Sequence, residues 1–175
     1  SDFYIDLWQL FSHPRLYEAA CKELLAKARI EDITRNMWFI GPERGAIPLA
    51  FMLAGLTHTR AGFMRKNNAK PFGMELGSFD PGKEGKNIVV VEDVITTART
   101  VEKVWRTLLA AGYNPKHMIL ALANRSGKRT LRLPISYDMH SSRDIPIVSL
   151  ISLDNPGWNA VGCTLCREGS QAKRF

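Results

Sequence analysis

"NIVVVEDVITTART", from Asn87 to Thr100, joins an apolar run, two acids and a threonine-rich turn, and it is the segment that most clearly indicates the fold. Its apolar run, Ile88–Val91, has the length and the β-branched composition of a buried strand. Two adjacent acids, Glu92 and Asp93, follow this run, and a threonine-rich turn then leads into a helical pattern. A buried strand that leads through a short turn into a helix is typical of a parallel βαβ unit.

The helical pattern after this turn is well defined. Val101, Val104, Trp105 and Leu108 have the spacing i, i+3, i+4, i+7, which places them on one face of a helix. Gly112 stands where such a helix is expected to end. The spacing therefore predicts an amphipathic helix that packs its apolar face on the sheet.

The remaining segments repeat the alternation of strand and helix. Further helices are expected from Pro14 to about residue 29, with Ser12 as the cap, and from about Ile47 onward. Further strands are expected at Met37–Ile40, Thr59–Met64, Met118–Ala123 and Ile145–Ile151, and a short one at Gly73–Ser78 inside a loop-like segment. The alternation predicts an α/β fold with a mostly parallel central sheet flanked by helices.

Composition limits the class of protein. The chain has 175 residues, 45% hydrophobic and 23% charged, which fits one globular domain over residues 1–175. The longest apolar stretch, Ile47–Leu56, is well short of the roughly 20 residues that span a bilayer. No signal peptide is visible, although a chain that begins at Ser1 without methionine is expected to lack an N-terminal piece. Three cysteines suit a reducing environment, so a cytoplasmic location is expected.

The chain is strongly basic, with a formal net charge of +7 and a pI near 9.5. Such an excess suits an anionic partner, which is either nucleic acid or a phosphorylated small molecule. A solvated basic surface without a partner explains the same composition. Charge alone leaves these alternatives open.

Ligands of parallel α/β folds bind at the carboxyl ends of the strands, so the loops after Ile40, Met64, Val91 and Ala123 are the expected site. The paired carboxylates are acceptors that suit vicinal sugar hydroxyls or a hydrated Mg²⁺. The threonines stand before a helix N-terminus, which attracts phosphate. Together these groups describe a phosphorylated sugar. The alternative is that the acids and threonines only cap the helix.

"VVVEDVITTART" resembles the phosphoribosyl-diphosphate motif of type I phosphoribosyltransferases. The resemblance implies that Glu92 and Asp93 hold the ribose hydroxyls and that the following turn wraps the 5-phosphate. Family members usually have glycine at one or both positions held here by Ala98 and Arg99, and alanine fits best if its φ is negative. The turn residues that the resemblance assigns to the sugar phosphate are Val94, Ile95, Thr96, Thr97, Ala98, Arg99 and Thr100.

"GPERGAIPLA", residues 41–50, is similar to the family's diphosphate-binding turn. The resemblance implies that Arg44 and the backbone of Gly45 contact the diphosphate. Gly41 and Gly45 are expected to allow positive φ and a close approach of the backbone. A plain connection between a strand and a helix is the alternative for this segment.

"RKNNAKPFG", residues 65–73, looks like the family's mobile catalytic loop. The resemblance implies that Lys70 stabilises the departing diphosphate, with Arg65 and Lys66 as further contacts. In the family this loop closes over the site of a neighbouring subunit, so a homodimer is expected. Phe72 stands where a histidine or tyrosine is common. A solvated basic loop is the alternative.

Two further segments resemble the base site of the orotate phosphoribosyltransferase branch. In "ALANRSGK", Arg125 matches the arginine that holds the orotate carboxylate, a planar contact that lysine does not reproduce. Tyr4 lies in the N-terminal stretch that helps to line the base, and Thr96 is expected to touch the base as well. An isolated surface arginine and an edge strand are the respective alternatives. Cys163 and Cys166 have metal-ligand spacing but supply only half of a tetrahedral zinc site.

The resemblance implies the type I phosphoribosyltransferase fold with a mobile loop and a small base-binding hood, and the activity of an orotate phosphoribosyltransferase in pyrimidine biosynthesis. Lys70 and Asp93 are the expected catalytic residues, and Mg²⁺ is expected as a cofactor carried mainly by the substrate, without direct protein ligands. The first alternative is a phosphoribosyltransferase for another base, or a nucleotide-sensing regulator on the same fold. The second is a nucleic-acid-binding regulator, which the sequence disfavours because its cations cluster on a loop and no helix-turn-helix signal is present.

Overall fold

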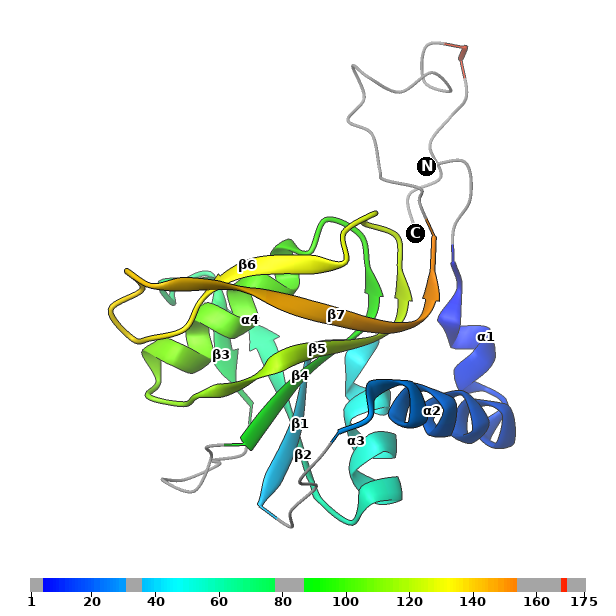
Figure 1. Cartoon of the computed structure of the whole chain (residues 1–175). Coiled ribbons are helices and arrows are strands. Elements are labelled where there is room, and N and C mark those ends of the chain that lie inside the picture. The colour runs from blue at the N-terminus through cyan, green and yellow to red at the C-terminus, as the bar shows by residue number, and fades with distance from the viewer. Residues whose placement is uncertain (1–4, 31–35, 78–86, 154–167, 170–175) are drawn as a thin grey trace.

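A computed structural model describes residues 5–30, 36–77, 87–153 and 168–169, and these form a curled sheet with helices on both faces (Figure 1). Tyr4, Cys163 and Cys166 lie outside the described residues. The helices are α1 (Leu7–Phe11), α2 (Pro14–Ala28), α3 (Ala46–Thr57) and α4 (Arg99–Ala110). The strands are β1 (Met37–Pro42), β2 (Arg60–Lys66), β3 (Met74–Leu76), β4 (Asn87–Ile95), β5 (Pro115–Asn124), β6 (Thr130–Pro134) and β7 (Ser142–Ser152).

The described strands form one seven-stranded sheet in the order β3-β2-β1-β4-β5-β7-β6. Strands β2, β1, β4, β5 and β7 run parallel, and β3 and β6 pair antiparallel at the two edges. The prediction of a mostly parallel α/β sheet is therefore confirmed. Because parallel strands end at the same edge, the loops after β1, β2, β4 and β5 meet there.

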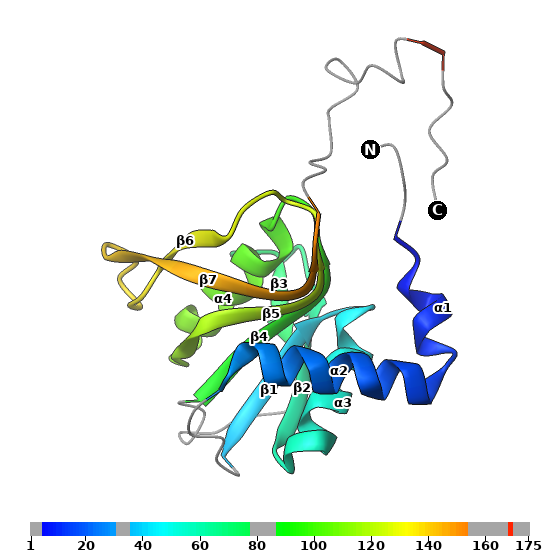
Figure 2. The same cartoon turned by 45° about the vertical axis from the view of Figure 1, so that its right-hand side comes forward.

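The two faces of the sheet carry separate apolar cores. Along β4, Val89 and Val91 pack with α2 and α3, whereas Ile88 and Val90 pack with α4. This alternation follows from the two-residue period of a strand. Figure 2 shows α2 and α3 on the side of the sheet opposite α4.

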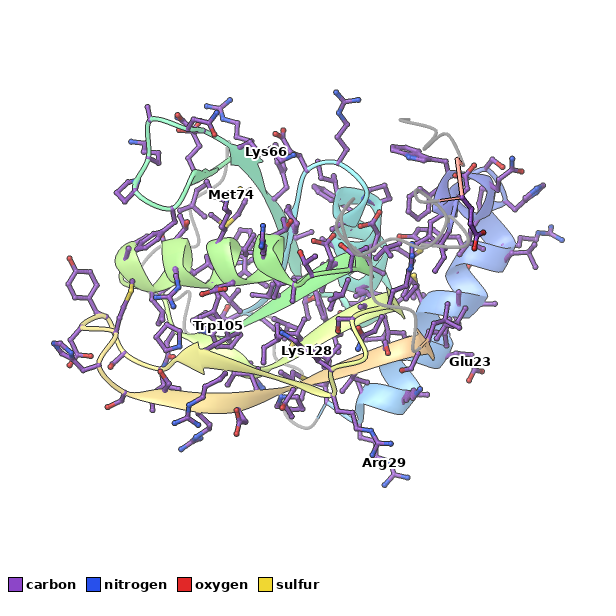
Figure 3. All side chains as sticks on the ribbon, turned by 90° about the horizontal axis from the view of Figure 1, so that it is seen from above. Glu23, Arg29, Lys66, Met74, Trp105 and Lys128 are labelled. Carbon is purple, nitrogen blue, oxygen red and sulfur yellow. The ribbon has the colours of Figure 1, made fainter. Side chains whose placement is uncertain are left out.

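Helix α4 has the apolar face that its sequence predicts. Val101, Val104, Trp105 and Leu108 are all buried. Trp105 lies between α4 and β6 (Figure 3), and its indole N–H donates a hydrogen bond of 2.8 Å to the carbonyl of Pro134. The helix ends at Ala110, and Gly112 follows with φ +82°, a left-handed conformation that suits glycine.

Some predicted boundaries were wrong. His13 is the N-cap of α2, and Ser12 instead ends the short helix α1, where its hydroxyl donates to the carbonyl of Gln9 at 2.7 Å. Strand β4 was expected to end at Val91 but continues to Ile95, because β5 extends alongside it and continues the ladder. The predictions also missed β6, a segment of five residues in which Leu131 and Leu133 are too few to show a period.

Candidate active site

Four predicted segments converge at the carboxyl edge of the sheet, and hydrogen bonds between them show the convergence directly. The carboxylate of Glu43, in the loop after β1, accepts a bond of 2.9 Å from the N–H of Lys66 at the end of β2. The backbone N–H of Arg125, after β5, donates to the carbonyl of Ile95 at 2.7 Å. Residues that lie far apart in the sequence are therefore in contact at this edge of the sheet.

The acid pair lies in the last part of β4. Glu92 is 7% exposed and Asp93 is half-buried, and the N–H of Asp93 donates to Glu92 Oε1 at 3.0 Å. Burial raises the pKa of the Glu92 carboxyl well above its usual range, and the neighbouring Asp93 carboxylate raises this pKa further. Lys66 lowers the same pKa, so its ammonium group acts on the acid pair from β2.

The loop between β1 and α3 is packed directly against Asp93. A Cβ atom added at Gly45 would lie 1.7 Å from Asp93 Oδ2, and one added at Gly41 would lie 2.6 Å from the Cβ of Ala46. The positive φ that glycine would allow is not used here, since Gly45 has φ −64° and Gly41 also stays outside the positive region. Both positions therefore need glycine for space. The peptide bond between Glu43 and Arg44 is cis.

The threonine turn leads into α4 without a side-chain cap. Ala98 is the N-cap residue, and no side chain bonds the helix N-terminus from this position. Thr96 and Thr97 are exposed beside it. Ala98 has φ +63°, so the negative φ under which alanine was expected to fit is not observed. Its side chain packs in the core with α4, and Arg99 is exposed to solvent.

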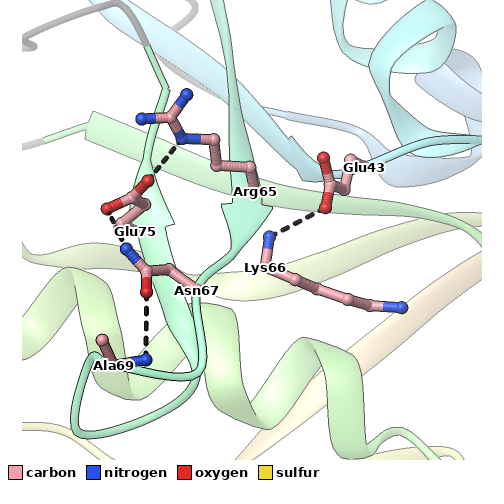
Figure 4. A network of polar contacts seen from close by, with 6 residues as sticks. All are labelled: Glu43, Arg65, Lys66, Asn67, Ala69 and Glu75. Carbon is pink, nitrogen blue, oxygen red and sulfur yellow. Dashed lines mark hydrogen bonds and ion pairs between the residues drawn. The ribbon is translucent and has the colours of Figure 1, made fainter.

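The basic side chains at the end of β2 point in two opposite directions. Figure 4 shows Arg65 and Lys66 leaving the strand on opposite sides, with Arg65 ion-paired to Glu75 of β3. Asn67 closes the loop that follows, because its side chain donates to Glu75 at 2.6 Å and accepts from the N–H of Ala69 at 3.0 Å. The structure thus brings Lys66 toward the acid pair and leaves Arg65 on the other side of β2.

Lys70 lies on the same side of the molecule as α4. It lines an open cleft of about 550 Å³ between the loop and that helix, together with Arg99. Neither Glu92 nor Asp93 lines this cleft. In the described conformation, therefore, the acid pair is not part of the cleft that Lys70 lines.

Arg125 follows β5 and is only 6% exposed. Beside it, at the ends of β5 and β7, a cavity of about 360 Å³ is lined by Asn124, Lys128 and Ser152 among others. Asn124 shapes this corner, since its side-chain oxygen accepts from the Ser126 hydroxyl at 2.7 Å and its amide donates to the Lys128 carbonyl at 2.7 Å. Sequence reasoning missed both Asn124 and Glu43. The turn-forming pattern Asn-Arg-Ser-Gly was a signal for Asn124.

Within residues 5–30, 36–77, 87–153 and 168–169, no group of three or more His, Cys, Asp or Glu side chains has the arrangement of a metal site. The acid pair offers oxygen atoms only, which suit a hydrated Mg²⁺ that keeps most of its waters. None of the described helices has the length and apolar character needed to cross a membrane.

Comparisons with known proteins agree with this geometry. The sequence profile of the phosphoribosyl transferase domain matches residues 9–153. The orotate phosphoribosyltransferase of Thermus thermophilus is 31% identical over 169 residues, covering 97% of this chain and 83% of the relative. That of Thermotoga maritima is 26% identical over 174 residues, covering 99% of this chain and 83% of the relative.

Solved structures show the same fold. The orotate phosphoribosyltransferase of Aeropyrum pernix superimposes with a TM-score of 0.66 at 25% identity, over 87% of this chain and 80% of that chain. The adenine phosphoribosyltransferase of Rhodothermus marinus superimposes with a TM-score of 0.61 at 22% identity, over 86% of each chain. The fold is thus shared by proteins that are named for different bases.

Proposed function

The chain belongs to the phosphoribosyl transferase domain family and is a pentosyltransferase, and from this premise we propose that its base substrate is orotate. The proposed reaction transfers 5-phosphoribosyl from 5-phosphoribosyl 1-diphosphate to orotate and gives orotidine 5-phosphate and diphosphate. The names of its relatives support a role in pyrimidine biosynthesis.

The observation that carries the sugar site is the acid pair beside an uncapped helix. Glu92 and Asp93 lie in the last part of β4, and α4 begins at Arg99, after the N-cap residue Ala98, which provides no side-chain cap. Carboxylates accept hydrogen bonds from ribose hydroxyls, and free helix N–H groups bind the 5-phosphate. The turn from Val94 to Thr100 would surround that phosphate, with the hydroxyls of Thr96 and Thr97 exposed to it.

The diphosphate would lie over the loop between β1 and α3. Gly45 lets this loop pack directly against Asp93 because it carries no Cβ, and Arg44 adds a cation suited to phosphate oxygens. Lys66, which lowers the pKa of Glu92 electrostatically, would contact the same group. Lys70 and Arg65 would join it only after the loop after β2 moves, or across a dimer.

Arg125 supports orotate as the base. Orotate carries a carboxylate, whereas adenine carries no negative group for an arginine to hold. A planar guanidinium forms a paired contact with a carboxylate, and burial strengthens such a contact. Arg125 is buried, and its backbone N–H donates a hydrogen bond to the carbonyl of Ile95. The base site would therefore adjoin the turn that would hold the sugar phosphate.

The chemistry requires stabilisation of a leaving group. As diphosphate leaves, positive charge develops on the sugar, and the protein lowers the barrier chiefly by neutralising the diphosphate and aligning orotate. Mg²⁺ bound to the diphosphate would supply part of that neutralisation. Arg44, Lys66 and Lys70 would supply cationic contacts, and Asp93 would hold the ribose beside the reacting carbon. Closure of the loop would exclude water from the activated sugar.

An assay of base consumption tests the proposal. With 5-phosphoribosyl 1-diphosphate and Mg²⁺ present, we expect orotate to be consumed, and adenine, hypoxanthine and uracil to be left unchanged. Arg125→Ala should raise the KM for orotate far more than the KM for the sugar substrate. Consumption of another base in place of orotate would contradict the substrate assignment, and binding of the sugar without any turnover would favour a regulatory role.

A further inference from the structure

The cleft between the loop after β2 and helix α4 has the chemistry of an anion site. Its lining includes Lys70, Arg99, Lys103 and Arg106, with Glu102 as the one carboxylate among its described residues. The formal excess is three positive charges around a hollow of about 550 Å³. We propose that this cleft binds an oligophosphate anion, either inorganic triphosphate or the phosphate chain of a nucleotide.

The cations come from two separate segments and meet without a matching set of acids. Arg99, Lys103 and Arg106 follow one another along the exposed side of α4, and Lys70 faces them from the loop. Glu102 pairs with Arg106 at 3.0 Å, so one cation is already neutralised. Among the described residues, no acid stands within ion-pair distance of Lys70, Arg99 or Lys103. Cations that line one cleft repel one another, and an anion between them relieves this repulsion.

The loop beside α4 is shaped by hydrogen bonds within itself. The N–H of Lys70 donates to the carbonyl of Asn67 at 3.0 Å, and the N–H of Gly73 donates to the carbonyl of Lys70 at 2.9 Å. The Lys103 ammonium lies 3.6 Å from the position that a Cβ atom would take if Gly73 had a side chain. The cleft is therefore framed by an ordered turn, which keeps cations from both segments near one another.

Phosphate is the anion that best fits this lining. Lysine and arginine donors with no accompanying metal-binding carboxylates suit a multiply charged phosphate chain. Pro71 and Phe72 form an apolar part of the wall, on which the base of a nucleotide can stack. None of the lining residues belongs to the acid pair or to the loop between β1 and α3.

Occupation of the cleft would affect the proposed transferase through Lys70, an effect that rests on the proposed function. An oligophosphate in the cleft would bind Lys70 and hold the loop against α4. The same lysine could not then reach the diphosphate of the substrate. Binding of the two anions would be mutually weakened, because coupling between two sites is reciprocal.

Calorimetric titration of the whole chain with inorganic triphosphate and, separately, with adenosine triphosphate tests the site. Lys103→Glu should weaken triphosphate binding about tenfold, since it replaces an attraction by a repulsion at the surface. Its affinity for 5-phosphoribosyl 1-diphosphate should be unchanged. Arg15→Glu on α2 is the matched control, because it makes the same charge change at an exposed residue on the opposite face and should alter neither affinity.

The outcomes separate the site from the proposed function. Equal triphosphate affinity in Lys103→Glu and the unaltered chain would overturn the proposal, as would an equal loss of both affinities. Lys103→Gln gives the same test without charge reversal if the first variant does not fold. If adenosine triphosphate binds more tightly than inorganic triphosphate, and Phe72→Ala removes this difference, the ligand of the cleft is a nucleotide. If the two bind equally, the cleft recognises the phosphate chain alone. None of these titrations requires turnover of orotate.

Discussion

Ala98 shows how the fold accommodates a residue that departs from the family pattern. A left-handed alanine costs roughly 1 to 2 kcal/mol relative to a residue with φ below zero, and glycine avoids most of that cost. The methyl group is buried in the core with α4, so it points away from the turn that would hold phosphate. Sequence reasoning recognised the departure from glycine but could not predict the conformation, which depends on packing beneath the turn.

Glu92 carries the clearest prediction of pH dependence. Its carboxyl pKa is raised from an ordinary 4.5, so the folded chain keeps this proton to higher pH than the unfolded chain does. The stability that the protonated group contributes is complete below the ordinary pKa and is lost as pH rises through the raised value. Glu92→Gln stays neutral, so its melting temperature should increasingly exceed that of the unaltered chain as pH rises.

Melting curves from about pH 5 to pH 9 check this expectation. Glu18→Gln is the control, because Lys22 lowers the pKa of that exposed carboxyl and no growing advantage should result. Affinity for 5-phosphoribosyl 1-diphosphate should rise with pH in the unaltered chain and stay flat in Glu92→Gln. A constant difference in melting temperature across the range would mean that Glu92 is ionised in the fold at every pH measured.

At the scale of elements, the anchoring of α4 decides where the phosphate turn lies. The helix packs on the sheet through its apolar face, and Trp105 ties it to β6 through the bond to Pro134. Its apolar periodicity predicted the helix and the buried face correctly. The partner strand β6 was missed, since its sequence is too short to show a period without the neighbouring β7.

Trp105→Phe should lower the free energy of unfolding by about 1 to 3 kcal/mol, because it leaves the buried Pro134 carbonyl without its donor. Denaturant unfolding measures the change. Trp8→Phe on α1 is the control, and with Trp8 56% exposed we expect a change below about 0.5 kcal/mol. Equal small losses in both variants would show that the bond to Pro134 adds no stability.

At the scale of the whole molecule, the position of Lys70 raises the question of which subunit supplies it. Lys70 lines a cleft beside α4, and the acid pair of its own chain does not line that cleft. Mixing Lys70→Ala with Glu92→Gln tests the homodimer that the resemblance implies. If the loop acts on a neighbouring subunit, random hybrids should restore about a quarter of the native sites.

Each variant alone should show little turnover of orotate, and the mixture should be compared with the sum of the two. A mixture that is no more active than that sum would mean that Lys70 acts within its own chain, or that it takes no part in the reaction. Size-exclusion chromatography of the unaltered chain supplies the accompanying measurement of oligomeric state.

The α/β class, the helix α4 and the order of the loops at the edge of the sheet could all be predicted from the amino-acid sequence. Local patterns predict these features, namely apolar runs, helical spacing, and acids that follow a strand. The sequence also pointed to the sugar-phosphate motif, whose residues lie next to one another in the chain. The single domain over residues 1–175 and the cytoplasmic location stay predictions.

Only the tertiary structure decided how these loops meet. It placed Gly45 under Asp93, buried Glu92, and turned Lys70 toward Arg99. Each of these facts joins segments that are separated by dozens of residues, and each depends on how the strands are ordered and how closely their ends pack. A local pattern carries no record of such distances, and burial, which shifts the pKa of Glu92, exists only once the chain has folded.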